Sequence, residues 1–430
     1  MKASTRLLRQ GLLGACLLSA QTVPALAAHP ITLSEAVRIA LTQNLSVERA
    51  AQGLEERKAL SQQAAVLPNP EIGAEAENIL GSGPYEGLDE ADFTVSLSQR
   101  IEIGGKRAAR VKAAQQAEAV SQAARDATER ALQKDVSIAF NHLLAAQEQV
   151  KAAKEAAEAI KRLLPALREK VERGASSEAD LNRGQLALDL AEIRLSNSET
   201  QLRTAQQALL ALWSEPAYRP VEAAGTFGVP DSNLPSFEEL NTRLEENPLL
   251  ESRRAEVEQR RATFDLERAK AVPDPTISAG TRYFNATDES AFLVSFSIPL
   301  TVFDRNRGNI DAAASRITQA DLGVRLSHAE LSRKLQEAYQ AYTGRCGEAE
   351  RLHRSVLPAA EQTSRTIRNG YIRGRFGVLD LLGATQTEIE SEIQAVEAVL
   401  ACRNAAAEIA GLTGLDLLNT GAASRRKAGE

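Results

Sequence analysis

The chain has 430 residues, of which 43% are hydrophobic, 25% are charged and only 4% are aromatic, and its formal net charge is −6. Alanine and leucine supply most of the apolar residues, a composition that favours long helices packed at close range over a large aromatic core. No apolar run approaches the length of about 18 residues that a membrane-spanning helix needs. The acidic charge argues against binding to nucleic acid.

The first 27 residues have the features of an export signal. Basic residues precede an apolar stretch over residues 11–20, and the sequence Ala-Leu-Ala ending at Ala27 is a small-residue cleavage site. An alternative is a lipoprotein signal, because the sequence Leu-Gly-Ala-Cys ending at Cys16 resembles a lipobox. We expect cleavage after Ala27 and therefore an exported protein without a lipid anchor.

The rest of the sequence contains an internal duplication with a period of about 200 residues. We expect a first unit over residues 28–212, a proline-rich linker over 213–236, a second unit over 237–415 and a C-terminal tail over 416–430 that is disordered after Leu418. Four landmarks recur in the same order with nearly constant spacing. They are Pro68-x-Pro70 and Pro273-x-Pro275, Phe93 to Ser98 and Phe292 to Ser297, Arg173-Gly174 and Arg373-Gly374, and Asp180-Leu181 and Asp380-Leu381.

Each unit is expected to contain the same elements in the same order. A capped helix comes first, the Pro-x-Pro segment ends it, two strands follow, and a long helix then turns back at a glycine. The strands alternate between apolar and polar residues and have about 10 residues, the length that crosses a bilayer when tilted. The predicted helices are 35–66, 106–172 and 178–212, then 237–272, 307–369 and 378–412; the predicted strands are 71–80, 93–103, 276–285 and 292–300.

Four strands per chain cannot close a membrane barrel, because the smallest closed barrels have about eight. Open strand edges in lipid would leave backbone groups unpaired. Either the strands lie outside a membrane or several chains share one barrel, and export together with the spanning length of the strands favours a shared barrel. The helix over residues 106–172 would extend about 100 Å at 1.5 Å per residue. The expected fold class is therefore α+β, a shared β-barrel continued by a long helical barrel.

The duplication resembles the TolC-like outer-membrane factor family. The segment from Gly81 to Asp89 and the sequence Ile-Gly-Gly-Lys-Arg-Ala-Ala-Arg over residues 103–110 are similar to the CzcC-type cation-efflux branch of that family. The resemblance implies a homotrimer with a 12-stranded outer-membrane barrel and a periplasmic helical tunnel. It also implies two partners, a periplasmic adaptor (membrane fusion protein) and a resistance-nodulation-division pump in the inner membrane.

The function that follows is a passive, gated outer-membrane channel of a tripartite efflux system that exports heavy-metal cations. One alternative with the same fold is efflux of drugs and organic compounds, or type I secretion. An alternative of another class is a periplasmic coiled-coil adaptor or structural protein. The alternating strands argue against that class, because an adaptor has no need of bilayer-length strands with one apolar face.

Enzymatic chemistry has little support in the sequence. There is no nucleophile elbow and no phosphate-binding loop, and Gly104-Gly105 before Lys106 is best explained as a hinge. We expect no catalytic residues, no cofactor and no resident metal, since soft metals need clustered Cys, Met or His. The four histidines are scattered and lack metal-ligand spacing; they are His29, His142, His328 and His353.

Three glutamates in the first predicted strand are candidates for ion selectivity. Glu71, Glu75 and Glu77 alternate onto one strand face, so a trimer would place nine carboxylates around one pore. Rings of like charge favour cations over anions. The alternative is an ordinary polar wall facing water.

The two helical turns are the strongest candidates for a functional site. A glycine supplies the backbone freedom that each helix end needs, and the resemblance makes these turns the periplasmic tips, where the channel closes and the adaptor docks. An Arg–Asp set at each tip would lock neighbouring helices, although an exposed pair contributes only about 0–1 kcal/mol. The alternative is helix capping with solvated charge. The residues are Arg173, Gly174 and Asp180, and Arg373, Gly374 and Asp380.

Two cysteines are expected to form a disulfide. Cys346 lies 28 residues before Gly374 and Cys402 lies 28 residues after it, so an antiparallel hairpin places them at similar heights. The periplasm is oxidising, and a bond requires Cα atoms within about 7 Å of each other. The alternative is two reduced cysteines that pack as small apolar residues.

Overall fold

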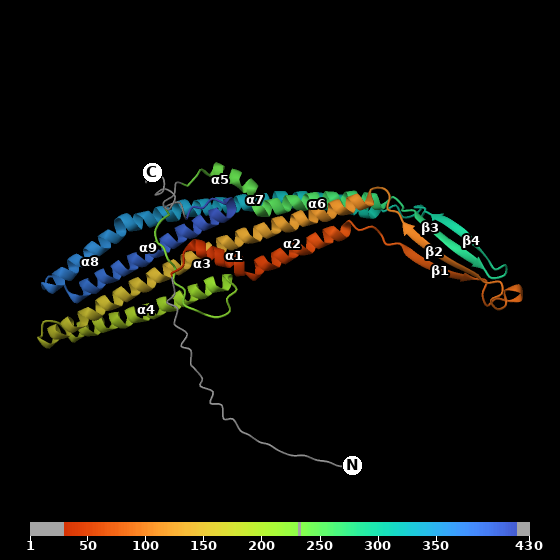
Figure 1. The fold of residues 1–430 in the computed structure, drawn as a ribbon. Coiled ribbons are helices and arrows are strands. Elements are labelled where there is room, and N and C mark those ends of the chain that lie inside the picture. Colours follow the sequence, from red (N-terminus) through yellow and green to blue (C-terminus); the bar gives the residue numbers. More distant parts are fainter. Residues whose placement is uncertain (1–29, 231–233, 419–430) are drawn as a thin grey trace, which may run out of the picture.

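The computed structural model describes residues 30–230 and 234–418 as an elongated molecule, with helices along most of its length and one sheet at its end (Figure 1). The two predicted units lie side by side and run in the same direction. The predicted signal peptide, with Cys16 and the cleavage site after Ala27, lies outside the described residues, as does the tail beyond residue 418.

The two units contain the same elements in the same order, as the duplication predicts. The first unit has α1 (Leu33–Gln43), α2 (Leu45–Ala64), β1 (Glu71–Glu77), β2 (Asp92–Arg100), α3 (Lys106–Glu172) and α4 (Glu178–Leu212). The second has α5 (Phe237–Arg243), α6 (Pro248–Lys270), β3 (Thr276–Phe284), β4 (Glu289–Ser297), α7 (Arg307–Arg351), α8 (Leu357–Ile372) and α9 (Val378–Thr413). Short 3₁₀ turns lie at Gly83–Tyr85 and Leu244–Glu246, and a π-helical turn lies at Leu352–Val356.

The first helix of each unit is interrupted, so the prediction of continuous helices over 35–66 and 237–272 is wrong at one place in each. Asn44 starts α2 and Asn247 starts α6, each with its side-chain oxygen accepting a backbone N–H from two residues later. The same side chains also donate to the end of the returning helix, Asn44 to the carbonyl of Leu212 and Asn247 to that of Leu412, both at 2.8 Å. In each unit, this bond fixes the break in the first helix to the C-terminal end of the last helix of the same unit.

The long helix of the second unit is also less regular than predicted over residues 307–369. A π-helical turn separates α7 from α8, immediately before Pro358 in the first turn of α8. Proline cannot continue the hydrogen-bond ladder of a regular helix, and an extra residue in the turn accommodates it. The helices over 106–172 and 178–212 end where the sequence predicts.

The four strands form one antiparallel sheet in the order β1-β2-β3-β4. β1 is shorter than the predicted strand 71–80, because Asn78 and Leu80 adopt left-handed backbone angles. The strand pairing places polar residues such as Glu75, Thr94 and Arg282 on one face, and apolar residues such as Val95 on the other. The predicted two-faced sheet is therefore present.

Each unit has its own hydrophobic core at mid-length, where the first helix packs on the long helices. The predicted linker over 213–236 takes part in the first core through Trp213 and Val221, and Ala223 forms a parallel bridge with Ile31. Phe227 of the linker packs against this first core and also against Ala349 and Val399 of the second unit, so the linker fastens the two units along their sides as well as joining them in sequence.

Candidate functional site

The polar face of the sheet contains all three glutamates that the sequence singles out. Glu71, Glu75 and Glu77 lie on the same face of β1, with Glu71 and Glu75 exposed. Glu77 is paired with Arg282 of β3 at 2.6 Å, and Arg282 also donates from Nε to the buried Thr94 hydroxyl at 2.9 Å. Arg282 offsets one of the three negative charges, so two glutamates per chain are left without that compensation. No sequence pattern points to Arg282, because its partners Glu77 and Thr94 lie on strands distant in sequence.

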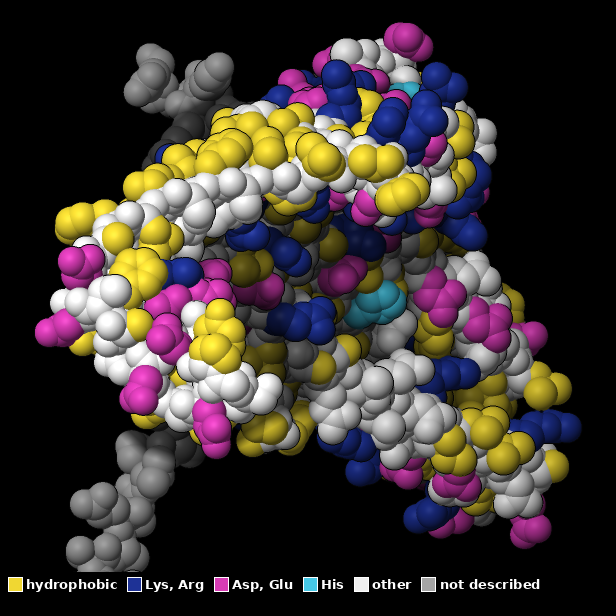
Figure 2. Space-filling model, turned by 90° about the vertical axis from the view of Figure 1, so that its right-hand side faces the viewer, with side chains coloured by type: hydrophobic (Ala, Val, Ile, Leu, Met, Phe, Trp, Pro, Cys, Tyr) yellow, Lys and Arg dark blue, Asp and Glu magenta, His cyan; other side chains and the backbone are white. Residues whose placement is uncertain are grey.

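The opposite face of the sheet is apolar and exposed in the single chain. Phe292 is 94% exposed and Val294 is 78% exposed. Viewed from the sheet end, hydrophobic side chains cover a convex outer edge, and charged side chains lie in the hollow beside it (Figure 2). One apolar and one charged surface on the same sheet is what a barrel wall between lipid and water requires.

The junction between sheet and helices is held by charged side chains that link the two units. The Nζ of Lys106, at the start of α3, lies 2.5 Å from Oδ1 of Asp274, which also accepts the backbone N–H of Ile103 at 3.0 Å. Arg110 pairs with Glu102 and donates to backbone carbonyls at the end of α2. The glycines predicted to act as a hinge, Gly104 and Gly105, both have the positive φ that glycine adopts readily, and the hinge itself stays a prediction.

The two predicted tips lie together at the end opposite the sheet (Figure 1). Gly174 and Gly374 have φ of +69° and +71°, the conformation that favours glycine after a helix end. Each aspartate caps the helix that follows: Asp180 accepts the backbone N–H of Ser177 at 3.3 Å, and Asp380 accepts that of Gly377 at 2.9 Å.

The arginines of the two tips do not form the predicted pairs with these aspartates in the described structure. Arg173 pairs with Glu169 on its own helix, and Asp180 binds Arg183 at 3.2 Å. Hydrogen bonds from the side chain and backbone of Ser177 lower the pKa of Asp180. The predicted residues therefore shape the tips, and contacts between the tips come from other residues.

Lys170 and Tyr371 connect the two tips. The Nζ of Lys170 lies 3.8 Å from the centre of the Tyr371 ring and 3.3 Å from the Tyr371 carbonyl oxygen. Tyr371 is buried beside Leu167 of α3 and Val378 of α9. Its hydroxyl has no hydrogen-bond partner within the described ranges, and burial, with a smaller contribution from Asp180, raises its pKa.

No local sequence pattern predicts the contact of Lys170 with Tyr371, although a difference between the two units points to it. The position 200 residues after Lys170 is Gly370, and the position 200 residues after Val171 is Tyr371. The two units therefore differ where their tips meet. Glycine is needed at position 370 because an added Cβ would lie 2.3 Å from the Phe376 ring.

Four glutamates from three helices lie close together in the helical part between mid-length and the tips. Burial raises the pKa of Glu392 in α9, and the charges of Glu155, Glu388 and Glu361 raise it further. A raised pKa means that the folded protein binds this proton more tightly than the unfolded chain. Ionisation of Glu392 therefore reduces stability as the pH rises through the folded pKa.

Replacing Glu392 by Gln is expected to stabilise the protein at pH 7.5. The gain is about 0.5 kcal/mol, the size of a like-charge pair such as Glu388–Glu392 on one helix, and it should vanish at about pH 3, where the carboxyl is protonated in both states. Melting in detergent at the two pH values measures it. The exposed Glu397→Gln is the matched control, and equal shifts in both variants would contradict the expectation.

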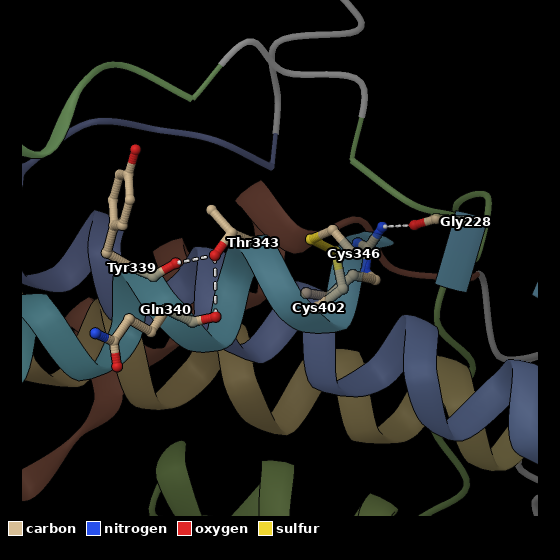
Figure 3. Close-up of a disulfide and its surroundings, with 7 residues drawn as sticks. Gly228, Tyr339, Gln340, Thr343, Cys346 and Cys402 are labelled. Atoms are coloured by element: carbon tan, nitrogen blue, oxygen red, sulfur yellow. Dashed lines mark hydrogen bonds between the residues drawn. A yellow bond between two sulfur atoms is a disulfide. The ribbon is translucent and has the colours of Figure 1, made fainter. Parts of the chain in front are cut away.

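A disulfide joins Cys346 of α7 to Cys402 of α9, with Cα atoms 4.8 Å apart (Figure 3). Both cysteines are buried. This is the pair that the hairpin geometry predicts. Beside it, Arg403 donates to the carbonyl of Gly228 in the predicted linker at 3.4 Å.

Other kinds of site are not seen in the described residues. None of the helices there is both long and apolar enough to cross a membrane. Within residues 30–230 and 234–418, no three His, Cys, Asp or Glu side chains are grouped so as to hold a metal ion.

Comparison with known proteins identifies the family. The model of the family "Outer membrane efflux protein" matches residues 36–215 and 240–415. The chain is 31% identical over 371 residues to the cobalt-zinc-cadmium resistance protein CzcC of Cupriavidus metallidurans, covering 86% of this chain and 87% of that one. It is 27% identical over 265 residues to the nickel and cobalt resistance protein CnrC of the same organism, covering 60% of each.

Two solved structures have the same fold. A structure of CusC matches with a TM-score of 0.74 at 17% identity, covering 90% of this chain and 92% of that one. The open state of the MtrE outer membrane channel of Neisseria gonorrhoeae matches with a TM-score of 0.74 at 19% identity, covering 90% and 89%. The chain is an outer-membrane protein and belongs to the outer membrane efflux protein family.

Proposed function

We propose that this protein is the outer-membrane channel of a tripartite efflux system and that it exports heavy-metal cations. It works as a homotrimer, whose three sheets share one barrel and whose helices form a tunnel through the periplasm. A periplasmic adaptor connects it to an inner-membrane pump of the resistance-nodulation-division type. The pump supplies the energy, and the channel provides a gated passive path.

The observation that carries this proposal is the two-faced sheet at the end of helices about 100 Å long. Four strands per chain are too few to close a barrel, and the apolar face supports contact with lipid. The proposal that the substrate is a metal cation is based on the relatives. CzcC is a cobalt-zinc-cadmium resistance protein, and CnrC is a nickel and cobalt resistance protein.

The acidic face of β1 is the proposed cation-attracting part of the pore. Glu71 and Glu75 are exposed on the polar face, whereas Glu77 is neutralised by Arg282. Rings of carboxylates raise the local concentration of cations. Glu71 and Glu75 therefore carry most of this effect, and the expected ring of nine carboxylates is reduced to six uncompensated ones in a trimer.

The two tips, with Gly174 and Gly374 at their turns, are the proposed gate and adaptor-docking site. Their location at the end remote from the sheet supports this role. Exposed charges there, including Arg173 and Arg373, are available to a partner. The two tips belong to two helical hairpins, α3–α4 and α8–α9. A partner that separates these hairpins would have to break the contact of Lys170 with Tyr371.

Deleting the gene and measuring growth on metals tests the proposal. We expect increased sensitivity to one or a few of zinc, cobalt, cadmium, nickel, copper and silver, with dyes and antibiotics unaffected. The intact gene should restore resistance, and a gene with Glu71→Gln and Glu75→Gln should restore it less completely. Sensitivity to organic compounds alone would keep the channel and contradict the metal assignment.

A further inference from the structure

Four polar side chains form a chain of hydrogen bonds across the contact between α3 of the first unit and α9 of the second. Arg403 of α9 donates from Nε to Oδ1 of Asn141 in α3 at 3.0 Å. Nδ2 of Asn141 donates to Oδ1 of Asn404 at 3.3 Å, and Nδ2 of Asn404 lies 3.2 Å from Nε2 of His142. Asn141 is fully buried, so its amide depends on these partners for its hydrogen bonds.

The guanidinium of Arg403 fixes the direction of every bond in this chain. An arginine side chain has donors only, so Asn141 must present its oxygen to Arg403 and its NH2 group to Asn404. Asn404 must then accept that bond on its own oxygen and donate to the imidazole. His142 therefore completes the chain only as a neutral ring that accepts at Nε2 and carries its proton on Nδ1.

We propose that this hydrogen-bond chain makes the contact between the two units sensitive to protons. A protonated imidazole is a donor at both nitrogens, so Nε2 of His142 would then face the NH2 group of Asn404, donor against donor. Turning the Asn404 amide would move the conflict to Asn141, and turning the Asn141 amide would set its NH2 group against Arg403. Because the conflict cannot be removed within the chain of bonds, acid loosens α3 from α9.

The charges on α3 and α9 around His142 favour the neutral ring or are already paired. Arg403 has no ion pair among the described residues, so its positive charge opposes a second one on the imidazole. Glu408 lies one turn after Asn404, and Lys134 of α3 holds it at 3.3 Å. Partial burial lowers the pKa of His142. The neutral ring is therefore the stable form in the folded chain near neutral pH.

The other helices beside this stretch bring no free carboxylate to the imidazole. Arg345 of α7 lines the same groove as Asn404 and pairs with Glu348 of its own helix at 3.0 Å. α1 and α4 pack against this part of α3 through apolar residues such as Ala40 and Leu209. In the ranges 30–230 and 234–418, the imidazole of this residue forms no ion pair, so protonation gains none.

The fold that the two units share does not require this histidine. The duplication has spacings of 199 and 200 residues near these helices. The positions reached from Asn141 and His142 at these spacings are Gln340, Ala341 and Tyr342 of α7. The second unit therefore has neither the asparagine nor the histidine there, and the chain of bonds belongs to the contact between the units.

Hydrogen exchange of the purified full-length protein in detergent, measured at pH 7.5 and 5.5, tests the proposal. After correction for the intrinsic pH dependence of exchange, we expect the open contact to be favoured at pH 5.5 by about threefold to tenfold, because a histidine freed on opening titrates at about pH 6.5. The neutral form stabilises the contact above this pH, and that stability is lost as the pH falls. The informative amides are those of residues 138–146 in α3 and 400–407 in α9.

Three variants make the test specific. His142→Gln still accepts the bond from Asn404 and does not titrate, so the effect of pH should disappear. Asn404→Asp accepts a bond from Asn141 and another from a protonated His142, so the effect should change sign, with the contact tighter at pH 5.5. The control is His328→Gln, which removes a histidine that pairs with Glu245 elsewhere on α7, and it should behave as the unmodified protein does.

The outcomes that contradict the proposal are distinct. Equal opening at the two pH values in the unmodified protein would overturn it, and so would an effect of pH that persists in His142→Gln. If the contact of Asn404→Asp still loosens in acid, protonation does not act through this chain of bonds, and the proposal is wrong. This last comparison decides the matter even where His142→Gln does not fold.

Discussion

Replacing Tyr371 by Ala is expected to separate the tips of the two helical hairpins. The ring is buried among Leu167, Val378 and Leu381, and the ammonium of Lys170 lies over it. Removing a large buried aromatic side chain costs about 3–5 kcal/mol, and loss of the cation–π contact adds about 0.5–2 kcal/mol. Because this contact joins α3 to α8 and α9, we expect the lost free energy to weaken the association of the two hairpins.

Hydrogen exchange of the backbone amides around the tips measures this effect directly. A loss of about 3 kcal/mol corresponds to exchange about 100-fold faster, if the tips open locally. In cells, the proposed gate would leak, so we also expect sensitivity to a hydrophilic antibiotic too large for general porins. Both measurements report on the same contact, one in the purified protein and one in the membrane.

Tyr371→Phe is the matched control for this experiment. It keeps the ring and its contact with Lys170 and removes only the hydroxyl, which is without a hydrogen-bond partner in the part of the chain that the structure describes. Removing an unsatisfied buried group is close to neutral or slightly stabilising. If the alanine and phenylalanine variants exchange at the same rate, the hairpins are held by other residues.

At the tips, some features are predictable from the sequence and others are not. The turns were predicted correctly because their signals are local: a glycine after each helix end, and an aspartate three residues into the next helix. The contact of Lys170 with Tyr371 could not be derived in that way, since it joins residues of different units. The duplication aligns the two units in sequence and does not say which side chains meet between them.

The helix interruptions illustrate the same limit. Asn44 lies inside a periodic helical pattern, and its local preference for a cap is weak evidence for a break. The deciding interaction is its bond to the carbonyl of Leu212, 168 residues away. The strand faces, in contrast, follow from a two-residue alternation that is complete within each strand, so the polar and apolar sides were predictable.

Removing the disulfide is expected to reduce the global stability of the folded chain. Cys346 and Cys402 are separated by 56 residues, and closing a loop of that length stabilises the folded state by about 4 kcal/mol in the chain-entropy model. The bond links α7 to α9, which also pack against each other through the core of the second unit. The loop that the disulfide closes includes the turn at Gly374. Without the bond, the unfolded chain therefore gains the conformational entropy of this entire loop.

The double variant Cys346→Ala with Cys402→Ala tests this prediction through its melting temperature in detergent. With an unfolding entropy of about 2.1 cal/mol/K per residue, a loss of about 4 kcal/mol lowers the melting temperature of a chain of this size by about 5 °C. Reductant should lower the melting temperature of the unmodified protein by a similar amount and leave the variant unchanged. Val399→Ala, which creates a cavity one turn away at a fully buried position, is the control for lost packing.

A comparison with the first unit supports the expected stabilising role of the disulfide. The positions 200 residues before the two cysteines are Ala146 and Leu202, and both are apolar residues of the helical layers. The corresponding place in the first unit is therefore held by packing alone, and its long helix is continuous through Pro165. In the second unit, the π-helical turn at Leu352–Val356 interrupts the helix six residues after Cys346. A cross-link beside that irregular turn compensates for the local loss of regular helix, so its removal should destabilise the second hairpin more than the first. Hydrogen exchange that rises equally in both hairpins of the double variant would contradict this account.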